Sequence, residues 1–230
     1  EFITFQFTEK EKDKPTLKNV FKYGKHELST RVDIPLYTRE GYRSNRYLGP
    51  SFYHNLRYGF RYSDKVYVGV TAEKDAGEPF FTGHNQKGYD FYSPYLLIKN
   101  WGKVRALALG NYRLNYGYGL GMNTDFSLGK TATLSTLGNK STGIKKHSST
   151  DEYRYFQGIA GSISLSNRLS ADAFYSYRTM DGTVDNLFIT SIKEDGYHRV
   201  QKDVEKKNTF SNQLIGSHIH YNGKYFEAGL

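Results

Sequence analysis

The sequence predicts an all-β fold, an antiparallel up-and-down β-barrel of about ten or more strands, with long loops at one rim and tight turns at the other. Two observations lead to this prediction. Apolar and polar residues alternate with a period of two along almost the whole chain, and short connections alternate with long ones. The composition agrees, because Tyr (21), Phe (15) and Gly (23) are abundant whereas Pro (5) is rare. We expect residues 1–230 to form a single barrel domain of a longer chain.

The strands are predicted from the alternation itself. Several are close to the ~9–11 residues that a tilted strand needs to cross a bilayer. One helix is expected before them, because Thr16 can cap it, Leu17, Val20 and Phe21 share a face, and Gly24 can end it. A second, polar helix is expected within residues 199–207. The alternating segments cover residues 1–8, 27–36, 54–62, 66–73, 89–99, 103–117, 155–166, 169–179, 211–221 and 224–230.

The connections between these segments fall into two classes. Tight turns are expected at Ser63-Asp64, Asn100-Trp101-Gly102, Asn167-Arg168 and Asn222-Gly223. Long excursions cover residues 38–50, 75–88, 118–154 and 180–210. Short and long connections alternate from residue 26 onwards, which is typical of membrane β-barrels with short periplasmic turns and long external loops. Residues 9–25 break this rule, because the connection there should be short.

The two faces of the predicted strands differ in polarity. One face carries aliphatic and aromatic residues, and the other carries charges that we expect to line a wet lumen. The acids Asp33, Glu73 and Asp172 are too few to pair the arginines one to one. Water, an anionic ligand or acids of a folded-in segment (Asp151, Glu152 or Glu194) would have to compensate. The candidate lumen and anion contacts are Arg31, Arg57, Arg61, Arg105, Arg113, Arg178, His218 and His220.

A net charge of +9 favours contact with anions such as nucleic acid, lipopolysaccharide or acidic glycans. The longest loop adds external binding candidates, Lys140, Lys145, Lys146 and Tyr153, although solvated loop charges are the simpler interpretation. The absence of Cys excludes disulfides and thiolate metal sites. A soluble or surface-exposed β-sandwich that binds acidic glycans or other anions is the main alternative to the membrane barrel.

Candidate sites for chemistry are weak. The stretch Gly117–Thr131 contains Gly-Lys-Thr but lacks the other glycines and the βαβ context of a phosphate loop. His147, Ser148 and Ser149 lie near Asp151 and Glu152, which leaves a barrel-embedded hydrolase as a remote alternative. His218 and His220 could share a metal, and Asp75 and Glu78 could bind calcium, but further ligands are missing. We therefore expect no enzyme activity, no metal and no cofactor.

Several motifs carry a family resemblance: Arg31–Tyr37 (RVDIPLY), Asp75–Phe81 (DAGEPFF), Gly88–Tyr92 (GYDFY), Asn111–Gly117 (NYRLNYG) with Gly119-Leu120, and Phe126–Lys130 (FSLGK). Over roughly residues 28–221 the chain resembles the C-terminal β-rich region of Bacteroidetes helix-hairpin-helix-domain-containing proteins. The resemblance implies a location in the outer membrane of a Gram-negative bacterium, in contact with outer-membrane lipid and other envelope proteins. It also implies an upstream helix-hairpin-helix module, which this chain lacks, and hence a possible link to nucleic acid. No catalytic residues come with it.

Overall fold

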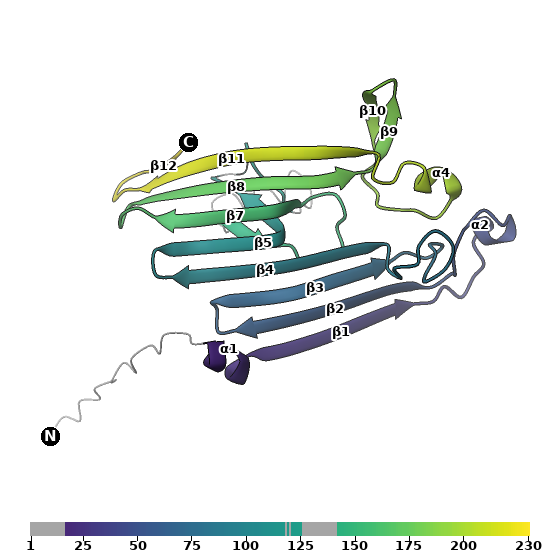
Figure 1. Cartoon of the computed structure of the whole chain (residues 1–230), viewed down its shortest axis with the longest axis horizontal. Coiled ribbons are helices and arrows are strands. Elements are labelled where there is room, and N and C mark those ends of the chain that lie inside the picture. The colour runs from purple at the N-terminus through teal and green to yellow at the C-terminus, as the bar shows by residue number, and fades with distance from the viewer. Residues whose placement is uncertain (1–16, 118, 120, 126–141) are drawn as a thin grey trace.

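The computed structural model describes residues 17–117, 119, 121–125 and 142–230. One large antiparallel sheet dominates these residues (Figure 1). Its strands are β1 (Lys25–Asp33), β2 (Tyr53–Tyr62), β3 (Val66–Lys74), β4 (Phe91–Trp101), β5 (Val104–Asn115), β6 (Gly143–Lys146), β7 (Phe156–Ser164), β8 (Leu169–Met180), β11 (Phe210–Asn222) and β12 (Glu227–Gly229). A separate hairpin consists of β9 (Gly182–Asp185) and β10 (Phe188–Ile192).

The helices are short. The predicted first helix is confirmed as α1 (Leu17–Tyr23), which stops before Gly24, while Thr16 and the expected strand at residues 1–8 lie outside the described residues. The polar helix within residues 199–207 is confirmed as a single turn, α4 (Gln201–Val204). A further turn of helix, α2 (Glu40–Arg43), lies in the first long connection and was not predicted. Within the described ranges, no helix is long and apolar enough to cross a membrane.

The sheet is a meander, with the order β1-β2-β3-β4-β5-β7-β8-β11-β12. The predicted alternation of short and long connections is confirmed. The long connections, with α2, α4 and the β9–β10 hairpin, lie at one end of the strands (Figure 1). We call this the loop end. The opposite end, here called the turn end, carries the tight connections between β2 and β3, β4 and β5, β7 and β8, and β11 and β12. Ser63 and Asn100 take the positive φ angles of 48° and 53° that such tight turns require.

The prediction of a closed barrel is wrong for this chain, because the sheet is open. The first strand of the order, β1, pairs only with β2, and the last, β12, pairs only with β11. All nine residues of β1 are exposed. The two edges of the described sheet do not pair with each other, so the sheet curves around a backbone segment without closing on itself.

That segment begins where β5 leaves β4. Pairing between the two strands ends at Tyr95 and Gly110, and Gly110 has a φ of 85°. Beyond this bend β5 pairs with β6 instead. The chain after β6 lies over β3 and β4, because Thr71 and Ser93 donate side-chain hydrogen bonds to the carbonyl oxygens of residues 148 and 147. The predicted strand over residues 103–117 is confirmed as β5, but residues 111–115 are covered on both sides, so its second half does not have one exposed face.

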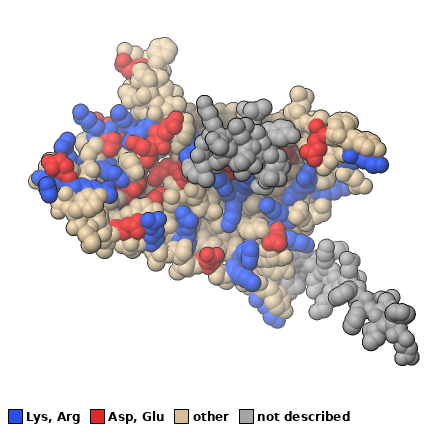
Figure 2. Space-filling model, turned by 180° about the vertical axis from the view of Figure 1, so that it is seen from behind, with Lys and Arg blue, Asp and Glu red and all other residues tan. Residues whose placement is uncertain are grey.

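The side of the sheet that faces this segment is the inner face. Paired residues of neighbouring strands share a face, so the core can be followed across the sheet. Its buried cluster joins β4, β5, β6, β7 and β8 and consists of Leu97, Ala106, Ala108, Tyr112, Leu114, Ile144, Ala160 and Phe174. Figure 2 looks onto this side, where charged side chains of both signs are numerous. We call it the concave face, because the same inner segment contacts strands from β3 to β8.

The opposite face is largely apolar and exposed, except at Phe60, which is buried against Phe21 of α1. One row of paired residues crosses the sheet on this outer side: His26, Phe60, Val68, Leu96, Leu109, Ile159, Tyr175 and Ile215. Ile159 is 46% exposed and Ile215 80% exposed. In the outward rows of β1, β2, β3, β4, β7, β8 and β11, Lys74 at the loop end is the one Lys, Arg, Asp or Glu. The predicted separation of polar and apolar faces is thus confirmed.

Candidate functional site

The concave face is the candidate functional site, and its loop end is closed by a network of buried charges around His198. The His198 ring lies between two carboxylates: Nδ1 is 2.6 Å from Asp90 Oδ2 and Nε2 is 2.7 Å from Asp181 Oδ2. Lys207 Nζ donates to the other oxygen of Asp90 at 2.6 Å. The His198 side chain is 1% exposed. These contacts tie the segment 193–208 to the end of β8 and to the start of β4.

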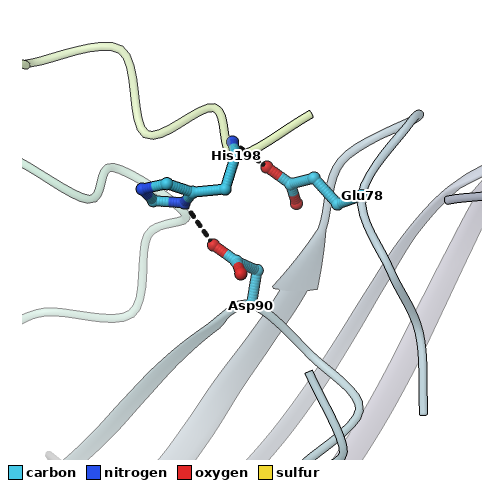
Figure 3. Close-up of side chains that lie close together, drawn as sticks. All are labelled: Glu78, Asp90 and His198. Atoms are coloured by element: carbon cyan, nitrogen blue, oxygen red, sulfur yellow. Dashed lines mark hydrogen bonds and ion pairs between the residues drawn. The ribbon is translucent and has the colours of Figure 1, made fainter. Parts of the chain in front are cut away.

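The backbone of His198 extends the network to Glu78. The N–H of His198 donates to Glu78 Oε1 at 2.7 Å (Figure 3). The N–H of Asp75 donates to the other oxygen, Oε2, at 2.8 Å. Burial, together with the nearby charge of Asp90, raises the pKa of Glu78 to about 7 despite these two donors. The contact of Glu78 with Asp75 is a capped turn, so the geometry supports a turn at Asp75–Glu78 rather than a calcium loop.

His198 is an imidazolium ion in this network. Burial alone would lower its pKa, but the bonds to Asp181 and Asp90 outweigh that effect and raise the pKa to about 9. Burial would likewise raise the pKa of Asp90, but hydrogen bonds from His198 and the charge of Lys207 lower it below its ordinary value. Two cations, His198 and Lys207, and two anions, Asp90 and Asp181, therefore hold the segment 193–208, the end of β8 and the start of β4 together.

Glu78, Asp90 and His198 also have the residue types of a metal site. One ligand atom of each lies within 4.8 Å of the others (Figure 3). A histidine ligand needs a free lone pair on its nitrogen, yet both nitrogens of His198 donate to carboxylates. Both oxygens of Glu78 already accept backbone N–H groups. The donor set therefore fits an ion-pair network better than a metal ion.

A small hollow of about 190 Å³ lies beside the network, lined among others by Glu152, Arg178 and Asp181. Burial and the charges of Asp90, Glu78 and Glu73 raise the pKa of Glu152 well above its ordinary value. This environment disfavours the negative charge that was expected of Glu152 as a folded-in acid. Asp151, another predicted partner of the inner arginines, binds the nearby Arg154 instead.

The hydrolytic constellation predicted as a remote alternative is not assembled. His147 is fully buried and stacks on Tyr155, with ring centroids 4.8 Å apart. Its Nε2 donates to the carbonyl oxygen of Asp151 at 2.9 Å, and its Nδ1 has no hydrogen-bond partner in the described part of the chain. Ser149 Oγ accepts the N–H of Asp151. Burial lowers the pKa of His147 to about 4, so the ring is a neutral packing element.

The turn end of the concave face is hollow. A cavity of about 1050 Å³ lies there, lined among others by Arg105, Asp172, His218 and His220. Tyr116 stacks on His218 at 4.3 Å, and His218 stacks on His220 at 6.1 Å. Asp172 Oδ2 lies 3.6 Å from His218 Nδ1. A third ligand that would complete a metal site at these histidines is missing from the described residues, where the one metal-like group is that of His198.

The six arginines assigned to the polar face have different partners. Arg31 pairs with Asp33 at 2.6 Å. Arg113 lies 3.7 Å from Asp125, an acid of the inner segment that the sequence reasoning did not name. Arg178 donates to the carbonyl oxygen of Tyr155 at 3.0 Å. A register shift at Arg105 lets that side chain reach Ser170 Oγ at 2.7 Å. Arg57 and Arg61 have no ion pair to any described residue.

The loop candidates are not a solvated external patch. Lys145 forms an ion pair with Asp125 of the inner segment, and Lys146 Nζ lies 3.5 Å from Tyr95 Oη on the concave face. Tyr153 lies under Arg178, with the guanidinium carbon 5.7 Å from the ring centroid. Lys140 lies outside the described residues. The expectation of solvated charges is wrong for Lys145 and Lys146, because the segment that carries them folds inward.

The residues around His198 were missed because the sequence places them far apart. His198 is 108 residues from Asp90 and 120 from Glu78. The one local signal was that each acid or histidine stands at the end of a strand or in a long connection, where loops of the same end can meet. No known protein-family model, no curated protein and no solved structure matches this chain.

Proposed function

We propose that this chain forms part of the wall and the plug of an outer-membrane β-barrel in a Gram-negative bacterium, and that the protein serves transport or uptake across the envelope. One observation carries the proposal: an exposed apolar face lies opposite a covered face that holds, beside the apolar core cluster, many charged side chains. The exposed outer face is apolar, whereas the covered concave face is rich in charges. This is the arrangement that a lipid-facing wall around a polar interior needs.

The outer face has the composition of a membrane surface. Valine, leucine and isoleucine cover its centre, for example Val68, Leu96, Leu109 and Ile159. An exposed apolar area of this kind is costly in water, and in a soluble protein it would need a partner to cover it. In a bilayer the same area is stabilising.

An aromatic cluster at the loop end supports the same conclusion. His54, Phe80 and Tyr89 pack on the outer side of the sheet, with ring centroids of Phe80 and Tyr89 5.2 Å apart and of His54 and Tyr89 5.4 Å apart. Phe81 adds to this cluster and is 62% exposed. Aromatic rings prefer the boundary between lipid and water. The cluster would mark the external membrane interface if the loop end faces outward.

The filled interior favours a gated or plugged channel over an open pore. At the loop end the inner segment and the His198 network occupy the concave face, while the cavity of about 1050 Å³ lies at the turn end. Under the proposed orientation this cavity faces the periplasm. The open edges of β1 and β11 would be closed by further strands, as a complete barrel requires. Envelope scaffolding is the second role that such a wall could serve.

The test is whether the protein behaves as a membrane barrel. We expect it to need detergent for extraction, to float with lipid vesicles in a density gradient and to run as a folded, heat-modifiable band in SDS. A protein that stays in solution without detergent and does not float would contradict the proposal and would favour the soluble anion-binding alternative. Planar-bilayer recordings should show no steady conductance while the inner segment is in place.

A further inference from the structure

The positive charges of the concave face are paired at the loop end and unpaired at the turn end. Towards the loop end, Arg31, Arg113, Lys145, Arg199 and Lys207 each have a carboxylate partner. Nearer the turn end stand five cations, Lys25, Arg57, Arg61, Lys99 and Lys146. None of the five has a carboxylate within 4.0 Å among the described residues. We refer to these five as the cation group.

The strand register brings the cation group together. Lys25 lies opposite Arg61, and Arg61 lies opposite Tyr67, so these side chains share the inner face. Lys99 Nζ lies 6.0 Å and Lys146 Nζ 5.4 Å from the centroid of the Tyr67 ring. Arg57 stands on the same face of β2, four residues before Arg61. The five cations therefore come from β1, β2, β4 and β6 but surround one place on the concave face.

Glycine residues leave the surface of the sheet between Arg57 and Arg61 without side chains. Gly59 lies between them on β2 and pairs with Gly69 of β3. A Cβ atom at Gly69 would lie 2.5 Å from the hydroxyl of Tyr95, so only glycine lets the Tyr95 ring lie across this position. Lys146 Nζ approaches the same hydroxyl at 3.5 Å. Between Arg57 and Arg61, β2 thus carries no side chain on this face, and the Tyr95 hydroxyl lies beside Gly59.

The electrostatics of this place call for an anion. Burial lowers the pKa of Lys146, the charges of Arg61 and Lys99 lower it further, and the charge of Glu27 raises it. A second acid, Asp64, accepts a hydrogen bond from the hydroxyl of Tyr67 at 3.3 Å. Two carboxylates cannot offset five cations, of which Lys25, Arg57 and Arg61 are exposed to solvent. Arginine side chains also present parallel N–H donors that match the oxygens of a phosphate group.

We propose that the cation group binds a phosphate-bearing solute with several negative charges, held between Arg57, Arg61 and Lys146 on the concave face. The inference rests on the proposed function, which makes this face the water-filled inside of a barrel. It names the class of solute that the interior admits from the turn end. The cavity lined by Lys99 and Arg105 adjoins the group and offers the path of entry.

The test compares two double variants with the same change in net charge. Arg57→Gln with Arg61→Gln removes two members of the cation group. Lys103→Gln with Arg168→Gln removes two exposed cations of the turn end that lie in the turns outside the concave face. Binding of inorganic tripolyphosphate to the purified protein in a zwitterionic detergent is measured by calorimetry at several salt concentrations.

We expect the wild type and the turn variant to bind tripolyphosphate alike. In the variant with Arg57→Gln and Arg61→Gln, the loss of two charge-assisted contacts should weaken tripolyphosphate binding at least about tenfold and reduce its salt dependence. Equal weakening in both variants, or no binding by the wild type, would overturn the inference. Binding of single-stranded oligodeoxythymidylate with no binding of tripolyphosphate would also overturn it and would indicate an extended nucleic-acid surface instead.

Vesicle flotation and heat modifiability of the same samples separate this inference from the proposed function. Arg57 and Arg61 lie on the face opposite the apolar surface, so their replacement should leave flotation unchanged. A wild type that binds tripolyphosphate but does not float would contradict the membrane proposal alone. A wild type that floats but does not bind would contradict the anion site alone.

Discussion

His198 Nε2 lies 2.7 Å from Asp181 Oδ2, and this buried contact holds the last long connection of the sheet against the end of β8. Asp181 follows β8 directly, whereas His198 lies in the segment after the β9–β10 hairpin. The same ring binds Asp90 on its other side, at the start of β4. A single imidazolium therefore fixes three chain segments that the meander alone would leave independent.

Replacing His198 should loosen the loop end without unfolding the sheet. In His198→Gln the carboxylates of Asp90 and Asp181 lose their shared partner, and breaking such a buried pair costs about 3–5 kcal/mol. Amide hydrogen exchange in residues 193–208 should therefore rise by orders of magnitude, while β2 to β5 stay protected. His84→Gln, an exposed histidine in the β3–β4 connection, is the control and should change little. An equal effect of both variants would mean that the network does not hold the loops.

The same network predicts a pH dependence in two steps. The pKa of His198 is raised to about 9, so its stabilisation is complete below ~6.5 and is lost as the pH rises through 9. The pKa of Glu78 is raised to about 7, so the stability linked to its proton is lost earlier, as the pH rises through 7. Asp90 has a lowered pKa, and its contribution is lost on acidification below ~4.

Exchange of residues 193–208, corrected for the intrinsic rate, should thus be slowest at mildly acidic pH and should accelerate near pH 7 and again near pH 9. Glu78→Gln should remove the first step and keep the second. His198→Gln should remove the second. A profile that is flat from pH 5 to pH 10 in the wild type would refute the assigned charge states.

Metal ions should leave the loop end unchanged. Both nitrogens of His198 and both oxygens of Glu78 already have partners, so a bound ion would have to break those bonds. We therefore expect no rise in Tm on addition of Zn²⁺ or Ca²⁺ and no fall on addition of EDTA at neutral pH. A clear rise with either ion that disappears in Glu78→Gln would instead establish a metal site there.

The sequence predicted the long strands and their connections better than the segment that lies inside the sheet. Period-two alternation and turn residues such as Asn222-Gly223 are local signals, so the long strands and the order of tight turns and long loops could be read directly. The inner segment left no comparable signal. The short strand β6 has four residues, and the chain after it is held over β3 and β4 by contacts from Thr71 and Ser93, more than fifty residues away in the chain.

The candidate site shows the same division. Face assignments placed Arg57, Arg61 and His218 on the polar side, which follows from alternation alone. Which cations find partners depended on the fold of the connections: Asp125 reaches Arg113 and Lys145 only because β5 bends inward. That bend depends on the backbone angle of Gly110, and a glycine in an alternating segment does not by itself reveal a positive φ.

The inward bend should be sensitive to one methyl group. Gly110 has a φ of 85°, and a Cβ there would lie 2.5 Å from the carbonyl oxygen of Pro94. Gly110→Ala should therefore destabilise the fold by about 1–3 kcal/mol and expose the inner segment to protease. Gly161→Ala is the matched control, because a Cβ at Gly161 meets no atom within 4 Å. Similar stability of the two variants would contradict the role of Gly110.

The polarity of the outer face makes a final prediction. Val68 lies in the middle of the apolar row and is 37% exposed, and Val184 of the β9–β10 hairpin is 42% exposed. By exposure alone, arginine should be tolerated equally at both positions. If the outer face contacts lipid, however, Val68→Arg places a charge in the hydrocarbon and costs about 2–4 kcal/mol, whereas Val184→Arg stays in water.

Urea-dependent folding into vesicles measures this difference, because folded and unfolded forms separate as heat-modifiable bands. We expect the midpoint for Val68→Arg to fall well below that of the wild type and the midpoint for Val184→Arg to remain near it. In detergent micelles, which are thinner and more deformable, the penalty at Val68 should shrink. Equal midpoints for both variants in vesicles would mean that the apolar face is covered by something other than lipid, and the envelope barrel would have to be abandoned in favour of a soluble sheet with a protein partner.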